Sequence, residues 1–221
     1  NMAVVYTNLA QDEMNRAQQA YQQQIRLEPQ AGDKARATYL GTVRQATEEA
    51  FQAYQRALRI NPKFVPAKIN LAMLYDQRGQ KREAEREFRK ILELRPELAD
   101  IHYSLGLLMA EDEDRLAEAV ESLAEGAKLS PDNPRIHYNL GLAYQKLGRV
   151  TDAEKELKQA LRVTRSDPTD CLVALAILYS QQKHFKEAAQ YADELISREP
   201  GNPQWRQFRA SLLEDKGAAE E

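Results

Sequence analysis

The sequence predicts an all-α protein, a solenoid of stacked antiparallel helix pairs that ends in a capping helix. Its composition is helical, because Ala, Leu, Gln, Glu, Arg and Lys dominate while Gly and Pro number nine each in 221 residues. The stretch HYSLGLLM at residues 102–109 returns 35 residues later as HYNLGLAY at residues 137–144. A two-helix unit that recurs at such a period buries its faces only against its neighbours, and this is the arrangement of a solenoid.

Composition and charge exclude several classes of partner. The net charge is −3 with both signs intermixed, so we expect no basic face for nucleic acid. No apolar run approaches the roughly 18–20 residues that a membrane span needs, so we expect no membrane insertion. The single cysteine, Cys171, excludes an internal disulfide framework and a thiolate metal cage. We therefore expect neither a metal nor a cofactor.

The chain starts at Asn1 with helix-like sequence and without a secretory pattern. This start indicates a fragment or a processed product. The compartment cannot be predicted from it, since a bacterial cytoplasm and a periplasm are both compatible.

The first 64 residues follow the repeat loosely and are predicted to hold two incomplete units. These are a truncated first repeat at residues 1–30, with its second helix at 15–29, and a degenerate repeat at residues 31–64, with helices near 33–44 and 48–62.

Four complete helix pairs follow, and a single helix closes the chain. The pairs are predicted at residues 65–98, 99–133, 134–168 and 169–202, the capping helix at 203–216 and a flexible tail at 217–221. A Gly or Ala lies in the middle of each first helix, at Ala72, Gly106, Gly141 and Ala176. An alanine recurs in each second helix, at Ala84, Ala119, Ala153 and Ala188. Prolines near the ends of the pairs terminate the second helices.

The recurring small residues predict a close crossing of two helices. A glycine inside a helix destabilises it by about 1 kcal/mol relative to alanine. Its return at Gly106 and Gly141 therefore indicates a point where a larger side chain does not fit. We expect the alanine of the second helix to form the opposite surface, and Tyr144 and Leu157 to fill the space beside it.

The densest match to a known pattern lies in residues 134–163. Its signature positions are His137, Leu140, Gly141, Tyr144, Gly148, Ala153, Leu157 and Ala160. These residues resemble the tetratricopeptide repeat (TPR) family, whose units have a period of 34 residues. The resemblance implies a right-handed TPR superhelix that serves as a non-catalytic scaffold for protein–protein interaction. In this family the first helices line a concave groove that receives an extended peptide or a partner helix.

Carried over to this chain, the resemblance implies a partner-binding groove on the first helices. Its residues are Asn70, Met73, Gln77, Tyr103, Ser104, Leu107, Tyr138, Asn139, Leu142, Gln145, Lys146, Val173 and Ile177. Asparagine amides hydrogen-bond a peptide backbone in both directions, and tyrosines offer a large contact area. The row Met73, Leu107, Leu142 and Ile177 is apolar for a wall that faces water, so either a partner or the curvature of the solenoid covers it.

Candidate catalytic residues are few, and we interpret the chain as a non-enzyme. His102 and His137 occupy the position where the family has a large residue that packs on the preceding repeat, which favours packing over catalysis. His184 lies in a turn between helices. Cys171 begins a predicted helix, where a small core residue is favoured over a reactive thiol. The acidic run at residues 111–114 lacks the alternating oxygen ligands and the turn glycine of a calcium loop.

Two other binding interpretations come from the same resemblance. One TPR subgroup clamps the C-terminal carboxylate of chaperones with Lys, Asn and Arg. This chain offers Asn70, Asn139 and Arg135 but has Ile69, Tyr103, Tyr138 and Val173 in place of the groove lysines, which disfavours such a clamp. The alternative is a structural role, through self-association or as the TPR region of a larger polypeptide. Residues 65–96 resemble repeats of bacterial multihaem cytochromes, although no C-x-x-C-H haem motif is present.

Overall fold

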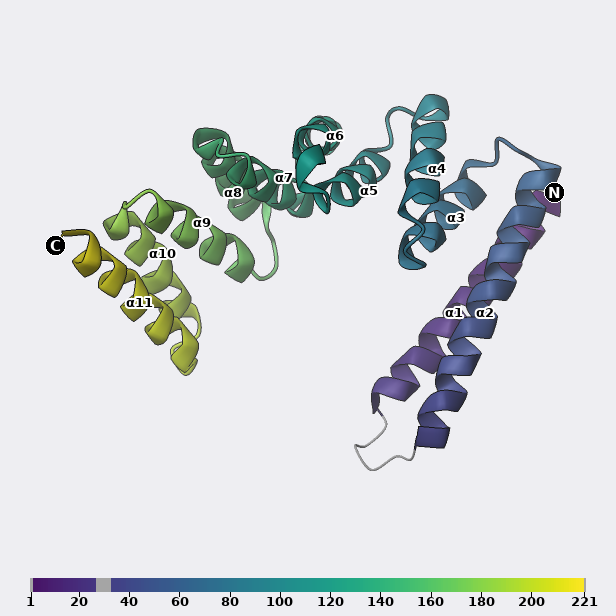
Figure 1. The fold of residues 1–221 in the computed structure, drawn as a ribbon, viewed down its shortest axis with the longest axis horizontal. Coiled ribbons are helices and arrows are strands. Elements are labelled where there is room, and N and C mark those ends of the chain that lie inside the picture. Colours follow the sequence, from purple (N-terminus) through teal and green to yellow (C-terminus); the bar gives the residue numbers. More distant parts are fainter. Residues whose placement is uncertain (1, 27–32, 221) are drawn as a thin grey trace. The chain divides into compact units, whose positions relative to one another are not determined.

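The computed structural model describes residues 2–26 and 33–220, and these residues are almost entirely α-helical (Figure 1). Within them lie eleven α-helices, one short 3₁₀ helix and no β-strand. The chain divides into two compact units, residues 1–96 and residues 97–221. The predicted all-α fold is confirmed.

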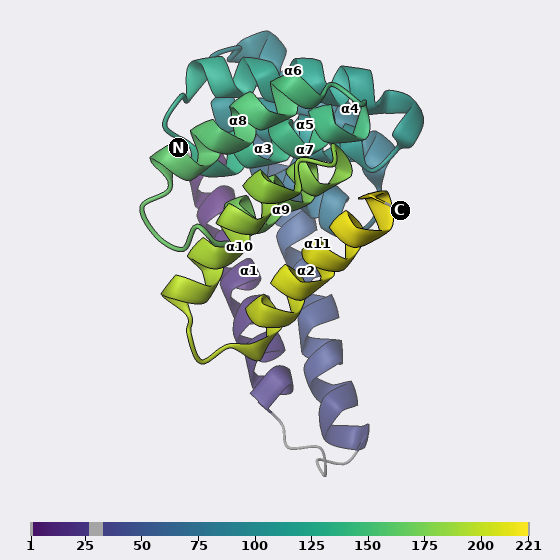
Figure 2. The same cartoon turned by 90° about the vertical axis from the view of Figure 1, so that its left-hand side faces the viewer.

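The first unit opens with a long helical hairpin made of α1 (Met2–Arg26) and α2 (Asp33–Ile60), which lie side by side (Figures 1 and 2). Alanines allow this close packing, because the distance between two helices depends on the side chains at their contact. On α1, buried alanines recur every seven residues at Ala3, Ala10 and Ala17, with Ala20 three residues further on; on α2 they are three or four apart, at Ala46, Ala50, Ala53 and Ala57. Each set therefore lies on one face of its helix.

The prediction of two incomplete helix pairs in the first 64 residues is wrong. α1 runs unbroken from Met2 into the segment predicted as a second helix at 15–29, and α2 runs unbroken through residues 44–48, where a turn is predicted. The stretch RQATE at 44–48 contains neither Gly nor Pro, and Ala46 is fully buried in the hairpin. Nothing in this stretch breaks a helix. Pro29 lies outside the described residues.

α3 (Val65–Gln77) and α4 (Lys81–Leu94) complete the first unit. α3 packs on α2, where Ala67, Leu71 and Leu74 join Tyr54 and Ala57 in one buried cluster. This cluster holds α3 against the hairpin and so positions the polar side chains of α3.

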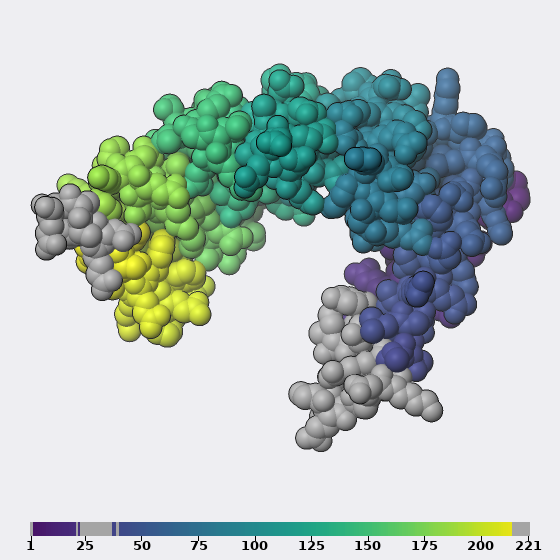
Figure 3. Space-filling model, viewed as in Figure 1, coloured from purple at the N-terminus to yellow at the C-terminus, as the bar shows by residue number. Residues whose placement is uncertain are grey.

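The second unit is a stack of three antiparallel helix pairs and a final helix. The pairs are α5 (Ala99–Ala110) with α6 (Leu116–Leu129), α7 (Pro134–Lys146) with α8 (Val150–Val163), and α9 (Thr169–Gln181) with α10 (Phe185–Arg198). The 3₁₀ helix Glu113–Arg115 lies between α5 and α6. In the space-filling view, successive pairs of this unit form one continuous surface (Figure 3). This arrangement is the predicted solenoid.

α11 (Pro203–Glu220) packs on α10 and closes the second unit. Leu212 is buried, and Phe208 packs partly buried against the cluster that contains Ala188 and Ala192 of α10. The predicted capping role of this helix is therefore confirmed. The helix extends to Glu220, beyond its predicted end at residue 216.

The turns inside three helix pairs share one geometry. In each turn a backbone N–H donates to the carbonyl of a tyrosine five residues earlier, over 2.9 Å, in the pairs Gln80 to Tyr75, Arg149 to Tyr144 and His184 to Tyr179. The residue before each donor has a positive φ, at Gly79 (72°), Gly148 (70°) and Lys183 (62°). Glycine adopts this left-handed conformation freely, whereas it is strained for lysine.

The predicted close crossing is confirmed in the pairs α5–α6 and α7–α8. The four small residues expected at it are all buried, namely Gly106, Ala119, Gly141 and Ala153. A Cβ atom on Gly106 would lie 2.6 Å from Leu123 Cγ and 3.1 Å from the Ala119 carbonyl oxygen. On Gly141 it would lie 2.7 Å from Leu157 Cγ. A leucine of the second helix therefore lies closest to the glycine, where the sequence predicts an alanine.

Candidate functional site

In the second unit the predicted groove residues lie on α5, α7 and α9, and side-chain hydrogen bonds join these first helices. The amide nitrogen of Asn139 on α7 donates to the Tyr103 hydroxyl of α5 over 3.2 Å and to the Arg135 carbonyl over 2.8 Å. The amide nitrogen of Gln145 donates to the amide oxygen of Gln181 on α9 over 2.8 Å. The first helices of this unit therefore lie side by side and present one shared face.

A pocket of about 280 Å³ opens on this face, between α5, α7 and the start of α9. Tyr103, Tyr138 and Asn139, all predicted groove residues, line it. The other lining residues are Pro134, Arg135, Thr164, Ser166, Asp167, Asp170 and Cys171. None of these seven is among the predicted groove residues, and three of them, Thr164, Ser166 and Asp167, lie in the segment that connects α8 to α9, outside the first helices.

The pocket combines aromatic surface with charges of both signs. The Arg135 guanidinium lies over the Tyr103 ring, 5.5 Å from its centroid, in a cation–π contact. Burial raises the pKa of the Tyr138 phenol, and the Asp170 carboxylate adds to the rise, so the hydroxyl stays a neutral donor. Asp167 accepts hydrogen bonds from the Thr169 backbone N–H (3.0 Å) and hydroxyl (2.6 Å), which hold the pKa of its carboxyl below the ordinary value.

The other predicted groove residues of this unit differ in exposure. Leu142 is half-buried and packs against the core cluster of α8 and α9, whereas the Ile177 side chain is 38% exposed. Ser104, Leu107, Gln145 and Val173 are half-buried, and Lys146 is exposed. The solenoid therefore covers part of the apolar row itself and leaves part of it open.

In the first unit, three predicted groove residues line a larger hollow. Asn70, Met73 and Gln77 of α3 face the α1–α2 hairpin across a groove of about 770 Å³. The rest of its lining is Gln11, Met14, Asn15, Ala17 and Gln18 of α1, Val43, Thr47 and Tyr54 of α2, and Leu74 of α3. The Asn70 amide hydrogen-bonds with the hydroxyl of Tyr54, which is 1% exposed. We call this hollow the amide groove, because five of its twelve lining residues are Asn or Gln.

The contributions of α1 and α2 are missing from the predicted groove, because only a second helix is predicted within residues 1–30. One signal identifies the α1 positions. Ala3, Ala10 and Ala17 recur every seven residues and mark the buried face of α1. Residues 11, 14, 15 and 18 lie beside that face at the helical period, so their side chains border the packed surface.

Three family profiles match the chain. A TPR repeat profile matches residues 112–148, and two tetratricopeptide repeat profiles match residues 44–108 and 132–198. Together these matches extend from residue 44 to residue 198, which is more than half of the chain. The chain belongs to the tetratricopeptide repeat family. The boundaries predicted above for its single repeats stay a prediction.

Two bacterial relatives are similar to this TPR chain in sequence. It is 31% identical over 115 residues to the TPR repeat-containing protein PA4667 of Pseudomonas aeruginosa, with 52% of the chain and 20% of that protein covered. It is 29% identical over 168 residues to the type IV pilus assembly protein PilF of the same organism, with 73% and 66% covered. The chain thus spans a fifth of the first relative and about two thirds of the second.

Solved structures show the same fold. MamA from Desulfovibrio magneticus RS-1 superposes with a TM-score of 0.71 at 17% identity, with 91% of this chain and 97% of that chain covered. PilW, described as a widely conserved type IV pilus biogenesis factor, superposes with a TM-score of 0.68 at 20% identity, with 100% and 90% covered.

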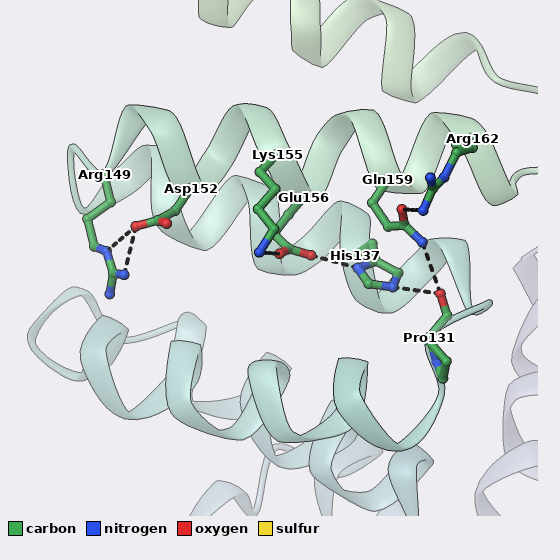
Figure 4. Close-up of polar contacts among 8 residues, drawn as sticks. All are labelled: Pro131, His137, Arg149, Asp152, Lys155, Glu156, Gln159 and Arg162. Carbon is green, nitrogen blue, oxygen red and sulfur yellow. Dashed lines mark hydrogen bonds and ion pairs between the residues drawn. The ribbon is translucent and has the colours of Figure 1, made fainter.

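In this TPR chain, His137 ties α7 to α8 and to the preceding turn (Figure 4). Its side chain is 8% exposed, with Nδ1 2.6 Å from Glu156 Oε2 and Nε2 2.9 Å from the Pro131 carbonyl oxygen. Because both ring nitrogens face acceptors, the imidazolium form satisfies both contacts. The hydrogen bond with Glu156, and then that with Pro131, raise the pKa of His137. His137 is thus buried, as expected for a packing residue, and its side chain is held by Glu156 of its own helix pair and by the Pro131 carbonyl.

His184 and Cys171, the two other candidates for chemistry, lie in positions that fit structural roles. His184 is exposed at the start of α10, which confirms its predicted place in a turn. Cys171 is 6% exposed, and burial raises the pKa of its thiol, so the protonated form is favoured, as expected for a core residue rather than a reactive one.

The acidic run at residues 111–114 is exposed. Across residues 2–26 and 33–220, no three His, Cys, Asp or Glu side chains are placed to hold a metal ion. In the same part of the chain, no helix has both the length and the apolar character of a membrane span.

Proposed function

We propose that this TPR chain is a protein–protein interaction scaffold that binds an extended peptide or a partner helix on the face of its first helices. The observation that carries the proposal is the pocket of the second unit, where Tyr103, Tyr138 and Asn139 come together from two first helices. Binding of a polypeptide needs no chemical step, and the proposal assigns the chain no catalytic role.

The chemistry of this pocket suits a polypeptide ligand. A carboxamide such as that of Asn139 donates and accepts, which matches both groups of a peptide bond. The tyrosine rings supply contact area at a small loss of conformational entropy. Arg135 and Asp170 add one charge of each sign at the same opening, so the pocket can also select a charged side chain on the partner.

Site-specific photo-crosslinking tests the proposal. A photoreactive amino acid replaces Lys146, an exposed residue of the predicted groove on α7, and in a matched variant it replaces Lys155 on α8, whose side chain is 79% exposed. We expect a defined protein adduct from position 146 and none from position 155 when both chains are expressed in their native cells. Equal adducts from both positions, or none from position 146, contradict the proposal.

A structural role in fibre assembly is a second candidate. It is favoured by similarity to two type IV pilus proteins, PilF in sequence and PilW in structure. Expression of the chain in Pseudomonas aeruginosa that lacks PilF tests this role: restored surface pili support it, and absent pili at a normal level of the chain count against it. Light scattering of the purified chain tests the self-association that such a role involves, since a dimer favours it and a concentration-independent monomer does not.

A further inference from the structure

The amide groove of the first unit is free of charge. None of its twelve lining residues is Asp, Glu, Lys, Arg or His, although 29% of the chain is charged. The pocket of the second unit differs, because Arg135, Asp167 and Asp170 all line it. The two hollows therefore offer different chemistry to a partner.

The groove offers open hydrogen-bonding groups along its walls. Within the described part of the chain, the carboxamides of Gln18 on α1 and Gln77 on α3 have no hydrogen-bond partner, and both side chains are exposed. The Gln11 amide nitrogen donates only to Asn15 Oδ1, over 3.3 Å, along the same helix. Carboxamides that donate and accept match the alternating N–H and C=O groups of an extended backbone.

Between these amides lies a soft apolar surface. Met73 is 47% exposed, and Met14 is half-buried on the opposite helix. Methionine side chains are flexible and polarizable, so they adapt to apolar groups of different shape. A volume of about 770 Å³ is within the range of roughly 300–1,000 Å³ that ligand pockets occupy.

From these features we infer that the amide groove binds an extended peptide segment with uncharged side chains at the positions that face the groove. Alternate side chains of an extended segment point to opposite sides, so every second residue enters the groove. A charged side chain loses water there and meets no opposite charge in the lining. Aliphatic, Met, Ser, Thr, Asn and Gln side chains avoid this penalty. The inference rests on the proposed function and specifies the kind of segment that the first unit recognises.

The test begins with selection of peptides from a random library on the intact chain. Recovered peptides are then measured by fluorescence anisotropy against the parent chain and three variants. Met73→Lys places a charge in the amide groove, at a site exposed enough to tolerate it. Met2→Lys is the matched control, because Met2 is 56% exposed on α1 and outside the groove lining. Arg135→Ala changes the pocket of the second unit and leaves the amide groove unchanged.

We expect a class of peptides with uncharged residues at alternate positions. Their affinity falls about tenfold or more in Met73→Lys and less than about twofold in Met2→Lys and Arg135→Ala. A lysine placed at a groove-facing position of such a peptide weakens its binding to the parent chain by a similar factor. A glutamate at that position binds Met73→Lys better than it binds the parent, because the two charges then pair.

Two results overturn the inference and leave the proposed function standing. One is a set of peptides that binds the parent and Met73→Lys equally but loses affinity in Arg135→Ala. The other is a set that depends on Met73 but carries charges at the groove-facing positions. If no peptide binds the intact chain at all, the inference and the proposed peptide binding both fail.

Discussion

Gly141 of α7 and Leu157 of α8 approach so closely that no side chain fits between them. A Cβ atom on residue 141 would lie 2.7 Å from Leu157 Cγ and 3.2 Å from the Leu157 backbone nitrogen. The same relationship joins Gly106 to Leu123 in the preceding pair, where a Cβ atom on residue 106 would lie 2.6 Å from Leu123 Cγ. The contact explains why a glycine stands in the middle of each of these helices.

Gly141→Ala is therefore expected to destabilise the second unit. An added methyl group gains about 1 kcal/mol of helix propensity, but overpacking against the side chain and backbone of Leu157 costs roughly 1–3 kcal/mol. Calorimetry of the two proteins measures the difference. Gly41→Ala is the matched control: Gly41 lies inside α2 with nothing within 4 Å of its Cβ position, so the same change is expected to stabilise the chain. A Gly141→Ala protein that melts at or above the parent temperature would show that the crossing is loose.

Ala153→Leu is expected to lower the stability of the second unit by roughly 1–3 kcal/mol. Ala153 is 0% exposed in the core cluster that also contains Leu157 and Leu175, so a larger side chain must displace its neighbours. Chemical unfolding followed by the fluorescence of Trp205 measures this change, because the chain has one tryptophan and it lies in this unit. Ala117→Leu, at an exposed position of α6, is the control and should leave the midpoint unchanged. Equal midpoints for Ala153→Leu and the parent would contradict the proposed packing.

Lys183→Gly is expected to stabilise the second unit. Lys183 has φ 62° in a turn whose equivalents are Gly79 and Gly148. The left-handed conformation destabilises the folded state by roughly 1–2 kcal/mol for a residue other than glycine. Glycine removes this strain, but its greater flexibility in the unfolded chain offsets about 0.5–1 kcal/mol of the gain. The net gain is expected to lie between about 0 and 1.5 kcal/mol, seen as a higher urea midpoint by Trp205 fluorescence. Gly148→Lys tests the reverse change and should lower the midpoint; a rise there would disprove the turn argument.

The stability of the second unit is expected to fall as pH rises above the ordinary histidine range. The Glu156 carboxylate and the Pro131 carbonyl raise the pKa of His137 above the value of about 6.5 for an unfolded chain. Between these two pKa values the folded state binds more protons than the unfolded state. The stability that the His137 contacts contribute is therefore fully present below about pH 6.5 and declines as pH passes through the folded pKa. Unfolding free energies measured between about pH 6 and pH 9 report this slope.

Variants identify the group responsible for the slope. The charged and polar side chains around His137 are those of Glu156, Lys155, Gln159 and Arg162 (Figure 4). Glu156→Gln removes the carboxylate that contributes most to the raised pKa, so the slope should largely disappear. His184→Gln removes an exposed imidazole and should keep the slope. If the slope survives in Glu156→Gln and disappears in His184→Gln, the proton uptake belongs to His184 and the assignment to His137 is wrong.

The periodic features of the fold were predictable because they depend on short stretches of sequence. Apolar residues at helical spacing, the turn glycines at Gly79 and Gly148 and the return of small residues every 34 or 35 positions each follow from local geometry. The resemblance to the TPR family, carried over to these positions, implied three residues of the amide groove and three of the second pocket, among them Met73 and Tyr138. Each lies on a first helix whose period is regular.

The remaining features depend on partners distant in the chain. The α1–α2 hairpin was misjudged because the repeat pattern was extended through residues 44–48, where nothing breaks a helix, and burial of Ala46 in the hairpin accompanies the continuous α2. Nothing in the local sequence shows that Glu156 faces His137, or that Gln18 and Gln77 face one hollow. The sequence alone thus determined the helical repeat, since its signals act within one turn or one helix pair. The tertiary structure decided the grooves and the buried ion pair, because these arise only where packing brings separate helices together.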